Sequence, residues 1–189
     1  MLLGDQGADV IKVDPPGGPR WNTPANATWN RGKRSILLDL KSSSDLDISR
    51  ELIQSADVVI ENFAPRVMPN FGLSGEALRA LNPDLTYVTM PGYGRSGPNK
   101  DWVAYGPTID GHAGHTWLTG YRNEIPWKCG IAWPDPTAGM HAAAATIVAL
   151  LDRQCCGITG QTVEVAQVET AINMIGQHVV ASQLGAPSS

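Results

Sequence analysis

Short runs of β-branched and apolar residues, each bounded by turn residues, constrain the fold of this chain most. They are candidate strands and lie at residues 10–14, 35–39, 57–61 and 85–90. Segments with helical periodicity or a capping serine separate several of them, at residues 44–55 and 74–81. Strands that alternate with helices predict a parallel α/β sheet with right-handed crossovers.

The two ends of the chain refine this prediction. Residues 1–7 are typical of the last turns of a helix, with Gly7 just past its end and a strand beginning at Val10. Because a helix cannot open a βαβ unit, we expect the first strand of the sheet to lie outside this chain. The C-terminal third is predicted to be mainly helical, with helices at residues 138–154 and 167–184 around a short strand at 161–165.

The predicted fold class is therefore α/β, an open parallel Rossmann-like sheet with helices on both faces that lacks its first strand and is followed by a mainly helical segment. We expect residues 1–189 to form part of one large domain, with the Rossmann-like part at about 1–160 and an extension at about 161–189.

Composition excludes several classes of function. The net charge is −4 with both signs interspersed, so we expect neither nucleic acid nor a membrane surface as a partner. Three cysteines, two of them adjacent, form neither a disulfide framework nor a Cys-x-x-Cys knuckle. The longest apolar run, residues 142–151, is about half of the ~20 residues that a bilayer span requires. We expect a soluble, cytoplasmic protein.

Asp135 is the most informative side chain. It lies in Trp-Pro-Asp-Pro-Thr-Ala-Gly at residues 133–139, immediately before the alanine-rich helix. One interpretation is structural: aspartate followed by proline is a favoured pair for the N-cap and first position of a helix. The other is chemical, because a carboxylate at a helix N-terminus stays ionised and can act as a nucleophile. The two interpretations are compatible.

Two further segments are candidates for binding a ligand. Residues 30–35 place three cations in a turn before a strand, Arg31, Lys33 and Arg34, which suit either a solvated basic turn or contact with phosphates. Asn62 and Phe63 follow Glu61 at the carboxyl end of a predicted parallel strand, where open α/β sheets place ligands, although a plain loop is the alternative. Arg20, after a Pro- and Gly-rich turn, is equally ambiguous.

Together, the segments at residues 133–141, 30–35 and 61–63 resemble the class III CoA-transferases, the family that includes formyl-CoA transferase, carnitine CoA-transferase and alpha-methylacyl-CoA racemase. The resemblance implies that Asp135 attacks an acyl-CoA thioester, that Arg20, Arg31, Lys33, Arg34, Asn62, Phe63 and Tyr105 line the CoA and substrate site, and that no cofactor is permanently bound. It implies acyl-CoA and a small carboxylic acid as substrates. It also implies an interlocked homodimer when the protein is full length, and a small domain that this chain lacks.

Tyr105 distinguishes between the transferase and racemase branches of the family. The resemblance implies that the racemases have a histidine at this position, and that this histidine moves the α-proton together with an aspartate. Tyrosine is a poor base at neutral pH because its ordinary pKa is about 10, so the transferase branch is favoured. Racemase action and a catalytically inactive CoA-binding fragment are the alternatives. Asn70 and Val103 depart from basic residues found in some members, which leaves the acceptor acid open.

Other patterns are weaker. Gly92-x-Gly94-x-x-Gly97 matches a dinucleotide fingerprint, but a proline follows where a phosphate-binding helix should begin. His112 and His115 are three residues apart, yet the sequence places no third ligand beside them, so we predict no metal site. His141 and His178 lie in apolar helical segments and are predicted to be core or interface residues.

Overall fold

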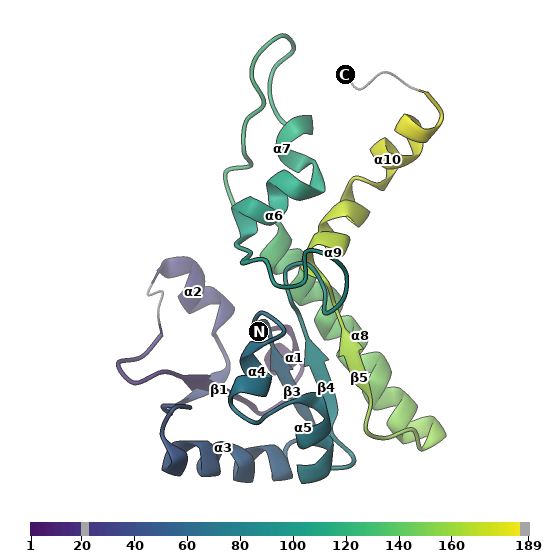
Figure 1. Cartoon of the computed structure of the whole chain (residues 1–189). Coiled ribbons are helices and arrows are strands. Elements are labelled where there is room, and N and C mark those ends of the chain that lie inside the picture. Colours follow the sequence, from purple (N-terminus) through teal and green to yellow (C-terminus); the bar gives the residue numbers. More distant parts are fainter. Residues whose placement is uncertain (20–22, 186–189) are drawn as a thin grey trace.

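Parallel strands with helices on both sides form the body of the protein, and a group of helices extends beyond the strands' carboxyl ends (Figure 1). The computed structural model describes residues 1–19 and 23–185. The elements in chain order are α1 (Leu2–Asp5), β1 (Val10–Asp14), α2 (Pro24–Trp29), β2 (Lys33–Leu37), α3 (Ser43–Ser55), β3 (Val58–Glu61), α4 (Val67–Asn70), α5 (Gly75–Leu81), β4 (Thr86–Thr89), α6 (Gly106–Ala113), α7 (His115–Leu118), α8 (Pro134–Cys156), β5 (Thr162–Glu164), α9 (Gln167–Met174) and α10 (Gly176–Gln183).

The described strands divide into two parallel sheets. β1 pairs with β2, with Val10 opposite Lys33 and Asp14 opposite Leu37. The second sheet has the order β3-β4-β5. The predicted parallel α/β class is confirmed, whereas the division into two hydrogen-bonded sheets was not foreseen, because strand order depends on pairing between distant segments.

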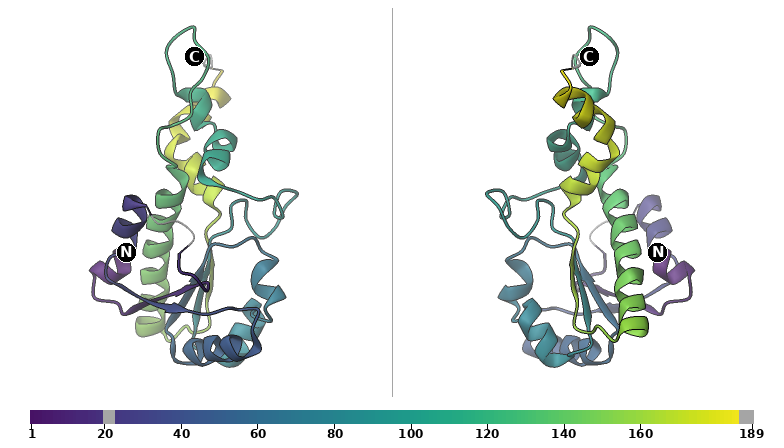
Figure 2. Two further views of the ribbon diagram at one scale, coloured as in Figure 1. Left: turned by 90° about the vertical axis from the view of Figure 1, so that its left-hand side faces the viewer. Right: turned by 90° about the vertical axis from the view of Figure 1, so that its right-hand side faces the viewer.

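Alternation along β4 explains why helices cover both faces of the three-stranded sheet. Successive strand residues point to opposite faces. Tyr87 packs in a cluster with residues of α3 and α5, including Ile53 and Leu78, whereas Val88 packs against Ala142 of α8. Figure 2 shows α8 on one side of these strands and α4 and α5 on the other. β4 is the central strand of this sheet, and all four of its residues are buried.

The group of helices beyond the strands is held by its own small core. Ile109 and Ala113 of α6 pack against Ala171 of α9, and all three are almost fully buried. α7 and α10 continue from these two helices, at the top of Figure 1. None of the helices described is both long and apolar enough to cross a membrane.

Several element boundaries differ from the sequence prediction. β1 has the predicted bounds, but β2 begins two residues earlier, at Lys33, because its first residues pair with β1. α8 begins at Pro134 rather than at residue 138 and ends at Cys156; Gly157 follows it, and its φ of 69° is the left-handed conformation expected there. The predicted helix at 167–184 is two helices, which meet at Ile175. His141 and His178 were predicted to be core or interface residues; both are exposed, so they are not core residues, and a place in an interface stays a prediction.

Candidate functional site

The candidate site lies at the carboxyl edge of the three-stranded sheet, which the first turn of α8 reaches. Ala138, four residues after the start of α8, packs in one cluster with Val88 near the end of β4 and Val165 just after β5. α8 therefore begins at the edge where the parallel strands end. This is where open α/β sheets place their ligands.

Asp135 is the second residue of α8, not the residue that precedes it. Trp133 occupies the N-cap position with α-helical dihedral angles, and Pro134 is the first helical residue. No side chain caps this helix. The prediction that Asp135 acts as the N-cap, with Pro136 first in the helix, is therefore wrong: the preceding proline, with its fixed φ, already suits the first helical position. The carboxylate is left free of a capping role.

The Asp135 carboxylate lies directly against the first residue of α6. A methyl group placed on Gly106 would lie 2.0 Å from Asp135 Oδ2 and 2.3 Å from the Cβ of Ala132. Both distances are far below van der Waals contact, so any larger residue here would have to displace its neighbours. This contact was not predictable from the sequence, since the two residues are 29 positions apart and Gly106 resembles any glycine before a proline.

The surroundings of the carboxyl group raise its pKa. Asp135 is exposed as a residue, but neighbouring protein removes part of the hydration of its carboxyl group, which raises the pKa above its ordinary value. A hydrogen bond from its own backbone acts in the opposite direction and is weaker. A carboxylate with a raised pKa is more basic than an ordinary aspartate and is accessible from solvent.

Tyr105 adjoins this contact. It is the N-cap residue of α6, immediately before Gly106, and its backbone is extended with φ −129° and ψ 156°. The side chain is 56% exposed. The structure therefore brings two of the predicted site residues, Tyr105 and Asp135, to the two sides of Gly106.

Asn62 and Phe63 follow β3 at the same edge of the sheet, as predicted. Both are exposed, and Phe63 is 43% exposed despite its apolar ring. Glu61 fixes the turn beneath them: its Oε2 accepts a hydrogen bond of 2.7 Å from the Phe63 backbone, and its Oε1 accepts one of 2.8 Å from the Tyr87 hydroxyl. Burial, followed by the charge of Glu61, raises the pKa of Tyr87, so this hydroxyl remains a donor.

The three cations of residues 30–35 bind partners within the chain. Arg31 makes a two-pronged ion pair with Asp5, at 2.6 and 3.1 Å, and Arg34 pairs with Asp9 at 2.7 Å. Lys33 donates to the Asn30 side chain at 2.9 Å. Partial burial, followed by the charge of Lys12, lowers the pKa of Lys33.

Lys33 and Arg34 lie in β2 rather than in the turn before it, which corrects the prediction. Arg20 lies outside the described residues, so its predicted role stays a prediction.

A cluster of aromatic side chains near the glycine turn escaped the sequence analysis. Tyr93, Trp102 and His112 have ring centroids 5.2 to 5.7 Å apart, and the Tyr93 hydroxyl is hydrogen-bonded to His112 Nδ1. His112 is thus engaged with Tyr93, whereas His115 faces the carbonyl of Ala171, so these two histidines have separate partners. The backbone of Arg95 donates to Glu164 of β5 at 2.6 Å, which ties the glycine turn to the sheet.

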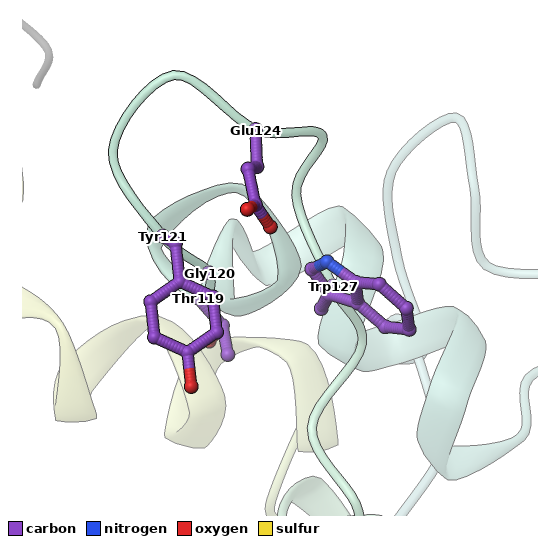
Figure 3. Close-up of a pocket in the computed structure, with 5 residues that line it drawn as sticks. All are labelled: Thr119, Gly120, Tyr121, Glu124 and Trp127. Carbon is purple, nitrogen blue, oxygen red and sulfur yellow. The ribbon is translucent and has the colours of Figure 1, made fainter.

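Surface hollows do not coincide with these residues. An open hollow of about 470 Å³ is lined by Thr119, Gly120, Tyr121, Glu124 and Trp127 in the loop after α7 (Figure 3). Another, of about 420 Å³, lies beside α5 and β5. Neither is lined by a predicted site residue.

The fold and the site define a parallel α/β protein with an accessible carboxylate at the carboxyl ends of its strands. The chain belongs to CoA-transferase family III, whose family model matches residues 1–188. The resemblance found in the sequence is confirmed.

Named relatives agree with this assignment. The succinate–glutarate CoA-transferase of Agrobacterium fabrum is 37% identical over 187 residues, which cover 89% of this chain and 46% of that protein. The formyl-CoA:oxalate CoA-transferase of Afipia carboxidovorans is 35% identical, over 92% of this chain and 43% of that protein. This chain thus spans less than half the length of these two relatives.

A solved structure shares the fold. The crystal structure of a CAIB/BAIF family protein from Brucella suis matches with a TM-score of 0.90 and 32% identity, over 99% of this chain and 53% of that one. Its agreement over nearly the whole chain supports the arrangement described above.

Proposed function

We propose that this chain is the CoA-binding and nucleophile-bearing part of an acyl-CoA:carboxylate CoA-transferase. Membership of the family supports CoA transfer in general. The observation that carries the finer proposal is Asp135: an accessible carboxylate with a raised pKa, at the carboxyl edge of the sheet, in contact with α6. Such a group combines the basicity and access that a covalent nucleophile needs.

The reaction proceeds by exchange between anhydrides and thioesters. An Asp135 oxygen attacks the thioester carbonyl, the C–S bond breaks, and a mixed anhydride and CoA thiolate result. The thiolate then attacks the aspartyl carbonyl and expels the donor acid, which leaves an aspartyl-CoA thioester.

The acceptor acid completes the cycle by the same two steps in reverse. Its carboxylate attacks the aspartyl-CoA thioester, giving a new anhydride and thiolate, and the thiolate attacks the acceptor acyl carbonyl to release the product and regenerate Asp135. The acyl activation is conserved throughout, provided that water is excluded from the site.

Tyr105 and Gly106 shape the space beside the nucleophile. Since Gly106 has no side chain, the Asp135 carboxylate can lie against the start of α6. Tyr105, the residue before Gly106, is exposed and suits contact with the acyl group. Because it is a poor base at neutral pH, α-proton transfer of the racemase kind is disfavoured.

The cations at residues 31–34 provide a route for binding the CoA phosphates. The ion pair of Arg34 with Asp9 is largely exposed, and pairs of this kind contribute only about 0–1 kcal/mol, so a phosphate can replace Asp9 at little cost. The two-pronged pair of Arg31 with Asp5 is less exposed, and a phosphate would compete with Asp5 for this guanidinium. Both guanidinium groups are suited to hold a phosphate by two parallel hydrogen bonds. Asn62 and Phe63 would contact the remainder of CoA, and Arg20 is proposed for the same site.

We propose, from the resemblance to the family, that the whole protein is a homodimer. Exposed apolar residues on α8 support an interface there: Met140, Ile147, Val148 and Leu151.

The experiment that tests the proposed function compares two variants of α8 in the intact protein. Asp135→Asn should abolish CoA transfer between acids, whereas Asp152→Asn, an acidic residue on the same helix, should leave it unchanged. A donor and acceptor panel then identifies the acids. Full transfer by the Asp135→Asn variant would refute the covalent mechanism, and deuterium uptake at the α-carbon from heavy water would favour a racemase instead.

A further inference from the structure

A second cluster of reactive side chains lies away from Asp135, where α6, α7 and the loop before α8 meet. It consists of Asp110 in α6, His115 at the start of α7 and Cys129 in the loop. One ligand atom from each residue can be chosen so that all three lie within 4.8 Å of one another. Oxygen, nitrogen and sulfur donors thus converge from three segments.

Asp110 is buried without adequate hydrogen bonds. The residue is 1% exposed. Its Oδ2 accepts only long hydrogen bonds, 3.3 Å from the Thr116 hydroxyl and 3.5 Å from the Cys129 backbone. Its Oδ1 has no hydrogen-bond partner among residues 1–19 and 23–185. A buried carboxylate oxygen without a partner is costly, so a further positive group is expected to face it.

His115 is oriented as a metal ligand. Its side chain is 10% exposed, and its Nε2 lies 2.9 Å from the carbonyl oxygen of Ala171. A carbonyl can only accept, so Nε2 carries a hydrogen, and in a neutral ring the lone pair then lies on Nδ1. Nδ1 lies 3.8 Å from the unpartnered Oδ1 of Asp110. A second ring nitrogen bonded to a backbone carbonyl is the usual support of a metal-binding histidine.

We propose that Asp110, His115 and Cys129 bind a zinc ion. Zinc accepts carboxylate, imidazole and thiolate ligands together, whereas magnesium and calcium prefer oxygen ligands alone. Zinc–ligand distances are about 2.0–2.3 Å, which places neighbouring ligand atoms roughly 3–4 Å apart and requires only small movements of these side chains.

Charge balance also favours a divalent ion. On binding, the Cys129 thiol releases one proton to solvent, and the carboxylate and thiolate together neutralise the two positive charges. A neutral centre suits a largely buried place. Water completes the fourth position.

The ion would anchor the segment that leads to the nucleophile. Residues 121–128 are all exposed, and Cys129 is the first residue after them that is partly buried. From Cys129 the chain runs through Ala132, which packs against the Gly106 position, to Asp135. A metal at Cys129 would fix this stretch against α6 and α7, so the role is structural and does not depend on the proposed transfer reaction.

Cobalt is a suitable probe, because Co²⁺ replaces zinc and reports thiolate ligation by its absorption. We expect one equivalent of Co²⁺ to give the visible bands of a tetrahedral site and a thiolate charge-transfer band, with zinc displacing it. Cys129→Ser should abolish the charge-transfer band, and Asp110→Asn should weaken binding by about tenfold or more. The matched control replaces the exposed Cys155 and Cys156 by serine and should change nothing.

A second measurement needs no variant. Zinc should slow alkylation of Cys129 in the intact protein by about tenfold or more and leave Cys155 and Cys156 equally reactive. The proposal is overturned if zinc protects no cysteine, if the cobalt band persists in Cys129→Ser, or if it depends on Cys155 and Cys156. Those results would instead favour a protonated His115 paired with Asp110.

Discussion

Replacing Gly106 with alanine tests the contact between α6 and the proposed nucleophile. The new methyl group would lie 2.0 Å from Asp135 Oδ2, so the carboxylate or the start of α6 must move by more than 1 Å to restore ordinary contact. A misplacement of about 1 Å at a reacting group costs on the order of 10²-fold in rate. Overpacking of this kind costs about 1–3 kcal/mol of stability. We therefore expect kcat for CoA transfer to fall about 100-fold in a protein that still folds.

Gly111 provides the matched control on the same helix. A methyl group there meets nothing within 4 Å, so Gly111→Ala should leave kcat unchanged and raise the free energy of unfolding by up to about 1 kcal/mol. The assays are steady-state CoA transfer and denaturant unfolding of the intact protein. Wild-type kcat and stability in Gly106→Ala would show that Asp135 does not lie against α6, and the account of the site would fail.

Three further predictions concern charges. Because its pKa is raised in the folded state, Asp135 destabilises that state at pH values above the raised pKa, but not below the ordinary value of about 3.9. Asp135→Asn should therefore raise the unfolding temperature at pH 7, and this gain should disappear on acidification. Equal unfolding temperatures of the variant and the wild type at pH 7 would contradict this. Burial raises the pKa of Asp14, but hydrogen bonds from Lys12 and Ser35 outweigh burial, so the pKa is lowered and the stabilisation that the carboxylate provides is lost as pH falls through the lowered pKa. Ser35→Ala should raise the pKa of Asp14, measured by NMR titration, and should lower the free energy of unfolding by about 1–2 kcal/mol at pH 7. An unchanged titration of Asp14 would count against this hydrogen bond. Arg34→Ala should raise KM for acyl-CoA several-fold, at most about tenfold, with kcat unchanged. Arg50→Ala, which removes another ion pair with an exposed aspartate, Asp47, should not raise KM, and equal effects would exclude Arg34 from phosphate binding.

Local signals in the sequence account for most elements of the fold. The bounds of β1, the left-handed glycine after α8 and the capping serine of α5 all follow from the residue types at those positions, and Ser74 does cap α5 through a 3.2 Å bond. The start of β2 was misplaced because Lys33 and Arg34 are extended by pairing with β1 rather than by their own preference.

Only those parts of the site that depend on a short stretch of sequence could be predicted. The tryptophan–proline–aspartate segment identified Asp135, yet its position within α8 depends on Pro134, and its contact with Gly106 arises from the packing of two distant helices. The metal-ligand cluster was missed for the same reason. His115 is brought to Asp110 by the turn between α6 and α7, and to Cys129 by a loop whose path no periodicity reveals.

Mapping the covalent intermediate tests the central claim most directly. The intact protein is incubated with acyl-CoA, quenched in acid and digested, and the peptide that contains Asp135 is examined by mass spectrometry. We expect an acyl or CoA adduct on Asp135 that disappears on addition of the acceptor acid. An unmodified Asp135 during steady transfer, or an adduct on another residue, would contradict the proposed role of this carboxylate.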